Sequence, residues 1–176
     1  MPRPLLALYA AFGIFAAALV AGAALLPDVL AADGLIPAIT REMRCAVCGM
    51  HPAAYPKWMA QVVFKDKSSA VFDSPAELFR YLQDLPRYAK GKKEADIGTL
   101  YVTDYAKSGW LDAKRAWFVA GSKATGPMGG PDLPALGSKE AAAAFAKANG
   151  GRVLGFGEVT KGVVRGLGDE AEGHHQ

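Results

Sequence analysis

The sequence predicts an α+β fold in which two similar small ββαβ units follow an N-terminal apolar helix. Two observations lead to this prediction. The pattern across residues 58–103 gives the order strand, strand, helix, strand, and a looser form of the same order returns across residues 115–156. A serine precedes the helical pattern in both halves, where it can cap the first turn. We therefore expect one unit in residues 45–110 and the other in residues 111–160.

Residues 1–32 are typical of a targeting or anchoring segment rather than of a folded domain. Arg3 precedes an apolar run over residues 5–26 that contains no charged side chain. The run is longer than the roughly 7–15 apolar residues of a secretory signal peptide, and it reaches the about 20 residues that span a bilayer. A cleaved signal peptide and an uncleaved inner-membrane anchor both remain open. Because Arg3 favours the cytoplasmic side, either one predicts that the rest of the chain is periplasmic.

The segments that flank the two units are expected to lack regular structure. Residues 33–44 contain Gly34 and Pro37 without a hydrophobic period, which predicts a linker. Residues 161–176 are rich in glycine and charged residues, which predicts a disordered tail.

The first unit has the clearest local signals. Residues 58–64 and 70–72 are rich in β-branched and aromatic residues, and we expect two strands joined by a polar turn. A helix should begin after Ser74, because Pro75 suits the first helical position and Glu77 can complete a capping box with the serine. A third strand near the end of the unit completes the order.

The second unit repeats this order with more loop between its elements. Residues 115–120 are expected to form a strand, and a loop rich in glycine and proline follows over residues 126–131. Ser138 should cap an alanine-rich helix that a glycine pair ends in the left-handed conformation. Residues 153–156 are the expected closing strand.

Charge and composition exclude two function classes. The chain has 176 residues and a formal net charge of +3, but its basic residues are interspersed with acidic ones. No dense basic stripe for phosphate binding results, so we expect no nucleic-acid partner. His51 is the only histidine in the expected folded region, and no serine, histidine and aspartate arrangement stands out, so we expect no enzyme.

Sulfur atoms are the most informative donors in the chain. The two cysteines, Cys45 and Cys48, form one C-x-x-C pair in the motif Cys-Ala-Val-Cys-Gly-Met-His-Pro over residues 45–52, whose glycine and proline favour a tight turn. A disulfide across so short a loop would stabilise the fold only weakly, which favours reactivity or metal binding. Thiolates and thioethers are soft ligands that select copper(I). Met50 is near enough to Cys48 for both sulfurs to face one ion.

The other methionines and the histidine are less decisive. Met59 lies in a predicted strand and is interpreted as a core residue, whereas Met43 in the linker is indeterminate. Met128 lies in the second glycine- and proline-rich loop, where spacing alone favours packing over a ligand role. For His51, a copper ligand and a surface histidine both remain open.

Two other cysteine chemistries compete with copper. A structural zinc site usually needs four nitrogen or sulfur ligands, often from two C-x-x-C pairs, and the chain has one pair. A thioredoxin-like redox pair should follow a strand and open a helix. Here a linker precedes the pair and Gly-Met-His-Pro follows it, which does not favour helix initiation.

Four segments, in order along residues 43–160, resemble the NosL family. Cys45-x-x-Cys48-Gly49-Met50 resembles the family's Cys-Gly-Met signature. The other three segments are Phe72-Asp73-Ser74-Pro75-Ala76-Glu77-Leu78-Phe79, Trp117-Phe118-Val119 with Gly126-Pro127-Met128-Gly129, and Ala141 to Phe145 with Gly150-Gly151-Arg152-Val153-Leu154-Gly155-Phe156. Each segment alone is a weak signal, but four in order are specific.

This resemblance implies a copper(I)-binding accessory protein, commonly a periplasmic lipoprotein, that serves the maturation of nitrous oxide reductase. It implies two similar ββαβ units related to part of organomercurial lyase, and it favours Met128 as a ligand. The predicted copper(I) ligands are Cys45, Cys48, Met50 and Met128. The expected partners are copper-site assembly proteins or a copper enzyme client, with the inner membrane as a further partner if residues 5–26 stay uncleaved. The chain departs from a lipoprotein in having no cysteine directly after its apolar run.

Overall fold

The computed structural model describes residues 36–172, with burial of side chains described through residue 167. The strands and longer helices are β1 (Ala60–Phe64), β2 (Ser69–Phe72), α1 (Pro75–Gln83), α2 (Leu85–Tyr88), β3 (Ile97–Thr103), β4 (Trp110–Asp112), β5 (Trp117–Ala120), β6 (Ala135–Leu136), α3 (Lys139–Asn149), β7 (Arg152–Gly155) and α4 (Lys161–Glu172). Short 3-10 turns are η1 (Pro52–Ala54), η2 (Glu94–Asp96) and η3 (Phe156–Glu158). The expected apolar helix lies outside the described residues.

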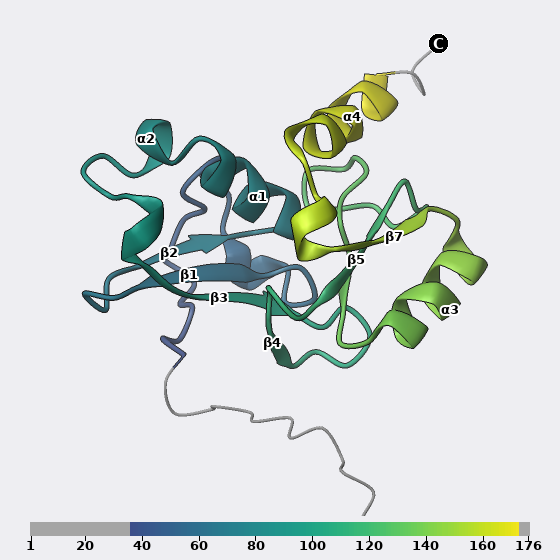
Figure 1. Ribbon diagram of the computed structural model, residues 1–176, viewed down its shortest axis with the longest axis horizontal. Helices are drawn as coiled ribbons and strands as arrows, with labels where there is room; N and C mark the ends of the chain where they lie inside the picture. The colour runs from purple at the N-terminus through teal and green to yellow at the C-terminus, as the bar shows by residue number, and fades with distance from the viewer. Residues whose placement is uncertain (1–35, 173–176) are drawn as a thin grey trace, which may run out of the picture. The chain divides into compact units, whose positions relative to one another are not determined.

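Two antiparallel sheets share one strand order, which confirms the α+β fold of two ββαβ units (Figure 1). The first sheet has the order β2-β1-β3-β4, and the second has β6-β5-β7. In both, the first strand of the unit is central, the second strand flanks it on one side, and the strand after the helix flanks it on the other. Because β4 pairs with β3, the first sheet continues past the expected unit boundary at residue 110.

The two units share one hydrophobic core, in which α1 is central. Leu78 and Phe79 on α1 are buried, and the Phe79 ring meets Phe118 of β5 at 5.0 Å and Phe156 of η3 at 5.1 Å between centroids. Both partner rings belong to the second unit. Such aromatic pairs bury large apolar areas, so α1 ties the second unit to the first. This packing fixes the N-terminus of α1 relative to the loops of both units.

Both unit helices begin as their sequences predict. The Ser74 hydroxyl accepts a hydrogen bond from the Glu77 amide at 3.3 Å, and the Ser138 hydroxyl accepts one from the Ala141 amide at 3.1 Å. The second half of the predicted capping box is wrong, because the Glu77 carboxylate forms an ion pair with Arg80 instead. The Glu77 side chain therefore does not complete the capping box that the local sequence predicts.

The prediction of a disordered tail from residue 161 is wrong for residues 161–172, which form α4. Val164 and Leu167 on this helix are buried, at 3% and 4% exposure, and belong to the shared core. Their spacing of three residues puts both side chains on one helix face. The disordered tail was predicted from a composition rich in glycine and charged residues, which does not reveal so short an apolar stripe. The stripe packs beside α1 (Figure 1).

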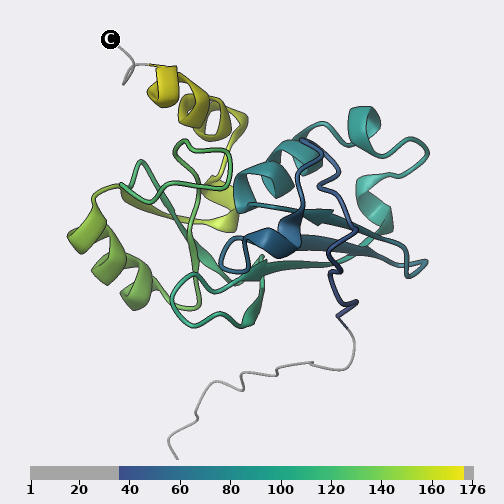
Figure 2. The ribbon, with the colours of Figure 1, turned by 180° about the vertical axis from the view of Figure 1, so that it is seen from behind.

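Residues 36–44 contain no helix or strand, and the cysteine motif follows them beside the first sheet (Figure 2). Among the described residues, no helix is both long and apolar enough to cross a bilayer. The apolar run over residues 5–26 lies outside the described part of the chain.

Candidate metal centre

The cysteine motif forms a closed turn. The Cys45 amide donates to the Met50 carbonyl at 2.7 Å, and the Gly49 amide donates to the Cys45 carbonyl at 3.0 Å. Gly49 has φ +77°, in the left-handed region that favours glycine. The Ala46 amide donates to the Val71 carbonyl at 3.0 Å, which fastens the turn to the end of β2. These bonds confirm the predicted tight turn and bring the two thiols to the N-terminus of α1.

Two reduced thiols and a carboxylate converge at this turn. The Sγ atoms of Cys45 and Cys48 and one Glu77 carboxylate oxygen all lie within 4.8 Å of one another. Cys45 is buried at 4% exposure, and Cys48 is partly buried. The Cys48 thiol donates a hydrogen bond to Asp73 Oδ1 at 3.1 Å. These three donor groups therefore lie close enough together to bind one metal ion.

The surroundings keep both thiols protonated in the absence of a cation. Burial raises the pKa of the Cys45 thiol, and the Asp73 carboxylate raises it further. Burial likewise raises the pKa of the Cys48 thiol, with Cys45 and Asp73 as further causes. A thiol with a raised pKa is a poor nucleophile at neutral pH, because the thiolate is the reactive form. A bound cation would reverse this balance by stabilising the thiolates.

Three buried carboxyl groups gather at the start of α1. Asp73 is fully buried, Glu77 is 2% exposed and Asp132 is 7% exposed. Asp132 Oδ1 accepts hydrogen bonds from the amides of Ala76 at 3.1 Å and Leu133 at 2.7 Å, so it caps α1 from the second unit. The site therefore depends on both units.

Burial and mutual repulsion raise the pKa values of two of these carboxyls, Glu77 and Asp132. Burial raises the pKa of Glu77, while Arg80 lowers it in part and Asp73 and Asp132 add to the rise. Burial raises the pKa of Asp132 to about 6. Asp73 Oδ2 and Glu77 Oε2 are buried without a hydrogen-bond partner among the described residues. Buried oxygens of this kind are costly, and a cation would satisfy them.

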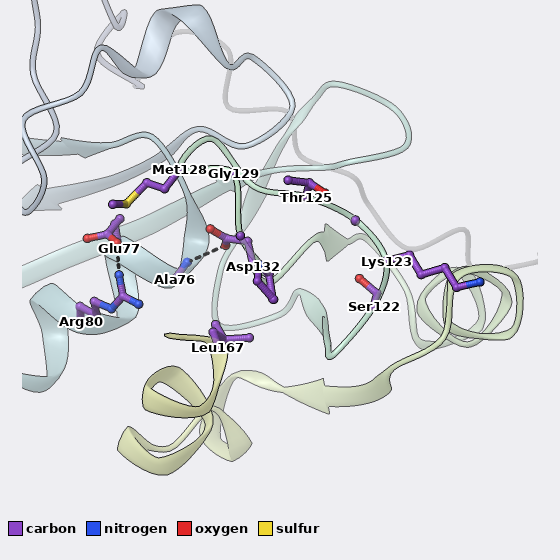
Figure 3. Close-up of a pocket in the computed structure, with 13 residues that line it drawn as sticks. Ala76, Glu77, Arg80, Ser122, Lys123, Thr125, Met128, Gly129, Asp132 and Leu167 are labelled. Atoms are coloured by element: carbon purple, nitrogen blue, oxygen red, sulfur yellow. Dashed lines mark hydrogen bonds and ion pairs between the residues drawn. The ribbon is translucent and has the colours of Figure 1, made fainter. Parts of the chain in front are cut away.

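Met128, in the second unit, lines a cavity with Glu77. It lies at the tip of the loop between β5 and β6, and of the large apolar side chains in the described residues only Met128 is exposed, at 61%. Figure 3 shows its thioether extending toward the Glu77 carboxylate. Met128 and Glu77 line one cavity of about 550 Å³. Glu77 therefore belongs both to the cluster with the two thiols and to the cavity that Met128 lines.

The predicted site residues are brought together unequally. The thiols of Cys45 and Cys48 lie within 4.8 Å of each other, and Met50 is half-buried in the same turn with its carbonyl bonded to the Cys45 amide. Met128 lines a cavity with Glu77, and neither cysteine lines that cavity. The His51 Nδ1 atom is buried without a partner among the described residues. Met59, interpreted as a core residue, is only half-buried just before β1.

Sequence reasoning missed Glu77 as part of this centre. A glutamate three residues after a serine is the usual pattern of a helix capping box, so its presence gives no reason to expect it beside the cysteines. Asp73 is also part of this centre, because its carboxylate accepts a hydrogen bond from the Cys48 thiol. The signal that could reveal Glu77 is tertiary, because the motif turn and α1 are separated by a whole hairpin.

The donor set fits a soft monovalent cation. Two thiols, with thioethers nearby, are ligands that favour copper(I), while one carboxylate and the absence of a second cysteine pair fit structural zinc poorly. Each thiol must lose its proton as a cation binds. The centre can therefore exchange protons for a metal ion at a partly exposed surface.

Comparisons with known proteins agree with this chemistry. The family model described as NosL matches residues 36–164. The chain is 31% identical to the copper-binding lipoprotein NosL of Achromobacter cycloclastes, covering 87% of this chain and 81% of that protein. It is 32% identical to the copper-binding lipoprotein NosL of Stutzerimonas stutzeri, covering 69% and 64%.

A solved structure gives the same result. The crystal structure of the copper chaperone NosL from Shewanella denitrificans matches with a TM-score of 0.62 and 29% identity. The match covers 72% of this chain and 96% of that one. The family model spans both ββαβ units and the cysteine motif, and the chain belongs to the NosL family.

Proposed function

We propose that this protein binds one copper(I) ion through Cys45, Cys48, Met50 and Met128 and carries it to a copper enzyme during maturation. The observation that carries the proposal is the convergence of both Sγ atoms within 4.8 Å of a Glu77 oxygen, together with the exposed Met128, which lines one cavity with Glu77. Copper(I) prefers such sulfur ligands. Its relatives are named as copper-binding proteins and a copper chaperone.

Carriage rather than permanent storage follows from the exposure of the donors. Cys45 is buried, but Cys48 and Met50 are partly exposed and Met128 is 61% exposed. An ion held by partly exposed soft ligands can pass to another protein by stepwise exchange of sulfur ligands, without release as a free ion. Cys45 serves as the fourth donor or as the alternate thiolate. His51 is an open fifth candidate.

The client and the compartment belong to the same proposal. We assign the client as nitrous oxide reductase or the copper-site assembly proteins that serve it, and the location as the periplasm. Residues 5–26 supply either the export signal or an inner-membrane anchor. The protein acts as a carrier and not as a catalyst.

A thiol–disulfide protein that keeps a partner's copper ligands reduced is the second candidate. The proximity of the two free cysteines favours it. The raised thiol pKa values oppose it, because attack on a disulfide requires a thiolate. A third candidate, a module that only docks at a membrane transporter, predicts neither copper nor thiol chemistry.

A copper(I) competition titration on the soluble body from Asp33 onward tests the proposal. We expect one equivalent of copper(I) per chain, with weaker binding after Cys48→Ser, Met50→Ala and Met128→Ala. Thiol exchange that survives both methionine variants and fails only in Cys48→Ser would support the second candidate instead.

Alkylation provides an independent readout of the same site. Equimolar cuprous ion should slow alkylation of Cys45 and Cys48, because coordinated sulfur no longer reacts freely. If copper(I) left the alkylation rates of the reduced, folded protein unchanged, the assignment of Cys45 and Cys48 as copper ligands would be contradicted.

A further inference from the structure

The sulfur atoms of this protein differ widely in their access to solvent. Cys45 is buried, and Cys48 and Met50 in the same turn are partly buried. Met128 is 61% exposed, and among the large apolar side chains of residues 36–167 it alone is exposed. A reagent dissolved in water therefore reaches the Met128 thioether more readily than the other sulfur atoms of the candidate metal centre.

The loop around Met128 holds the thioether in this accessible position. The Gly126 amide donates to the Gly130 carbonyl at 2.8 Å, and the Gly129 amide donates to the Gly126 carbonyl at 3.0 Å. A Cβ on Gly126 would lie 2.7 Å from the Asp132 side chain, so the base of the loop is tightly packed. The backbone on both sides of Met128 is thus held in place, while its side chain extends from the loop (Figure 3).

The two thiols are less accessible to a dissolved oxidant. Cys45 belongs to the hydrophobic core, and the Cys48 thiol donates its proton to Asp73 Oδ1 at 3.1 Å. An oxidant must contact the sulfur atom, so the susceptibility of a sulfur follows its exposure. Accessibility therefore favours Met128 as the first sulfur of this centre to be oxidised.

We propose that Met128 is a modification site, at which a peroxide converts the thioether to a sulfoxide and thereby weakens copper(I) binding. The effect on copper rests on the proposed function, in which Met128 is a ligand. A thioether is a soft donor that suits copper(I), whereas a sulfoxide is polar and presents a harder oxygen. Because Met128 is exposed, the added oxygen displaces no core residue, and the fold stays intact.

The oxidation transfers one oxygen atom and two electrons. The lone pair of Met128 Sδ attacks one oxygen of hydrogen peroxide, so an S–O bond forms and the O–O bond breaks. The departing hydroxide takes the proton from the transferred oxygen and leaves as water. Sulfur is oxidised and the peroxide is reduced. A methionine sulfoxide reductase reverses the change, because its two thiols become a disulfide while the sulfoxide oxygen leaves as water.

Peroxide treatment of the copper-free, full-length chain in detergent tests the oxidation site. At about pH 5 both thiols are protonated, whereas a thioether needs no ionisation to react. Peptide mass spectrometry assigns added oxygen to each methionine, and alkylation after denaturation counts the remaining thiols. The other methionines of the described residues, Met43, Met50 and Met59, are all partly buried. We expect sulfoxide to form at Met128 at least about fivefold faster than at these three, with both thiols retained.

Competition titration then measures the copper(I) affinity of the oxidised protein. We expect the affinity to fall by about tenfold or more, with an unchanged midpoint of urea unfolding. Treatment with both stereospecific methionine sulfoxide reductases should restore the affinity, which they could not do if a cysteine had been oxidised to a sulfinic acid. Peroxide should not alter the affinity of Met128→Leu. Met59→Leu, the matched control, should remain as sensitive to peroxide as the wild type.

Two results would overturn the proposal. One is faster oxidation of a partly buried methionine or of either cysteine than of Met128. The other is an unchanged copper(I) affinity after complete oxidation of Met128, in a preparation whose untreated form binds copper. Failure of the proposed function is distinguishable, since an untreated protein that binds no copper(I) still reveals the order of oxidation in its mass spectra.

Discussion

The Cys48 thiol donates a hydrogen bond to the buried Asp73 carboxylate, with 3.1 Å between Sγ and Oδ1. The two residues lie 25 positions apart, one in the motif turn and one directly before the N-cap of α1. This bond joins the cysteine motif to the helix that carries Glu77. It also places a carboxylate where it opposes ionisation of both thiols.

Replacing Asp73 with asparagine should make both thiols more reactive. Asp73 raises the pKa of each thiol, second to burial for Cys45, so Asp73→Asn removes one cause and leaves burial in place. We expect the pKa values of both thiols to fall. Alkylation of the copper-free protein at pH 7 should then be up to about tenfold faster. Iodoacetamide rates measured against pH check this, and unchanged rates would contradict it.

Copper(I) affinity should increase with pH below the thiol pKa values. Burial keeps both thiols protonated when the site holds no cation, so each thiol that binds copper releases a proton. The affinity should rise about tenfold per pH unit if one thiolate binds and about a hundredfold if two bind. Competition titrations between pH 6 and pH 8 distinguish these cases. An affinity independent of pH would exclude thiolate ligands.

Met128→Leu should weaken copper binding and leave stability unchanged. The side chain is 61% exposed, so its replacement should alter the free energy of unfolding by less than about 0.5 kcal/mol. Loss of one sulfur ligand should reduce copper(I) affinity by about tenfold or more. Met59→Leu is the matched control, because Met59 is a methionine outside the cavity. Equal copper(I) affinities for Met128→Leu and Met59→Leu would show that Met128 is not a copper ligand.

Asp132→Asn should flatten the pH dependence of stability between about pH 4 and pH 6. Burial raises the pKa of Asp132 to about 6 in the folded protein, from an ordinary value of 3.8. Its stabilising contribution is complete below pH 3.8 and is lost as the pH rises through about 6, because the folded state holds the proton more tightly. The slope reaches at most about 1.4 kcal/mol per pH unit.

Urea denaturation of the wild type and Asp132→Asn at several pH values measures this difference. The exposed Asp112, changed to asparagine, serves as the control for loss of a carboxyl group. Parallel stability curves for the wild type and Asp132→Asn would contradict the predicted titration.

Leu167→Ala should destabilise the fold by about 2–5 kcal/mol, the usual cost of such a truncation in a packed core. Leu167 is 4% exposed and belongs to the core that both units share. Arg165→Ala, on the exposed face of the same helix, should alter stability by less than about 0.5 kcal/mol. Thermal or urea unfolding compares the two. If both substitutions changed the free energy of unfolding by a similar small amount, α4 would not contribute to the core in solution.

Local sequence signals predicted the main strands and helices of the two units and the turn that carries the two cysteines. Ser74 and Ser138 predict the two helix starts because a cap bonds only within its own first turn, and the cysteine motif predicts its turn through Gly49. The order of strands and helices then predicts two similar units. These features depend on neighbours in the chain, so no tertiary information is needed to read them.

Only the tertiary structure decided that Glu77 lies beside the two thiols while lining a cavity with Met128, and that α4 is part of the core. The neighbouring residues predict that Glu77 takes part in a helix cap. Its carboxylate lies beside Cys45 and Cys48 only because the hairpin between the cysteine motif and α1 folds back. Val164 and Leu167 form too short an apolar stripe to predict burial, and they become buried because α1 and the second unit leave an apolar surface for them. Contacts between distant segments are set by packing of the whole chain, which no local pattern encodes.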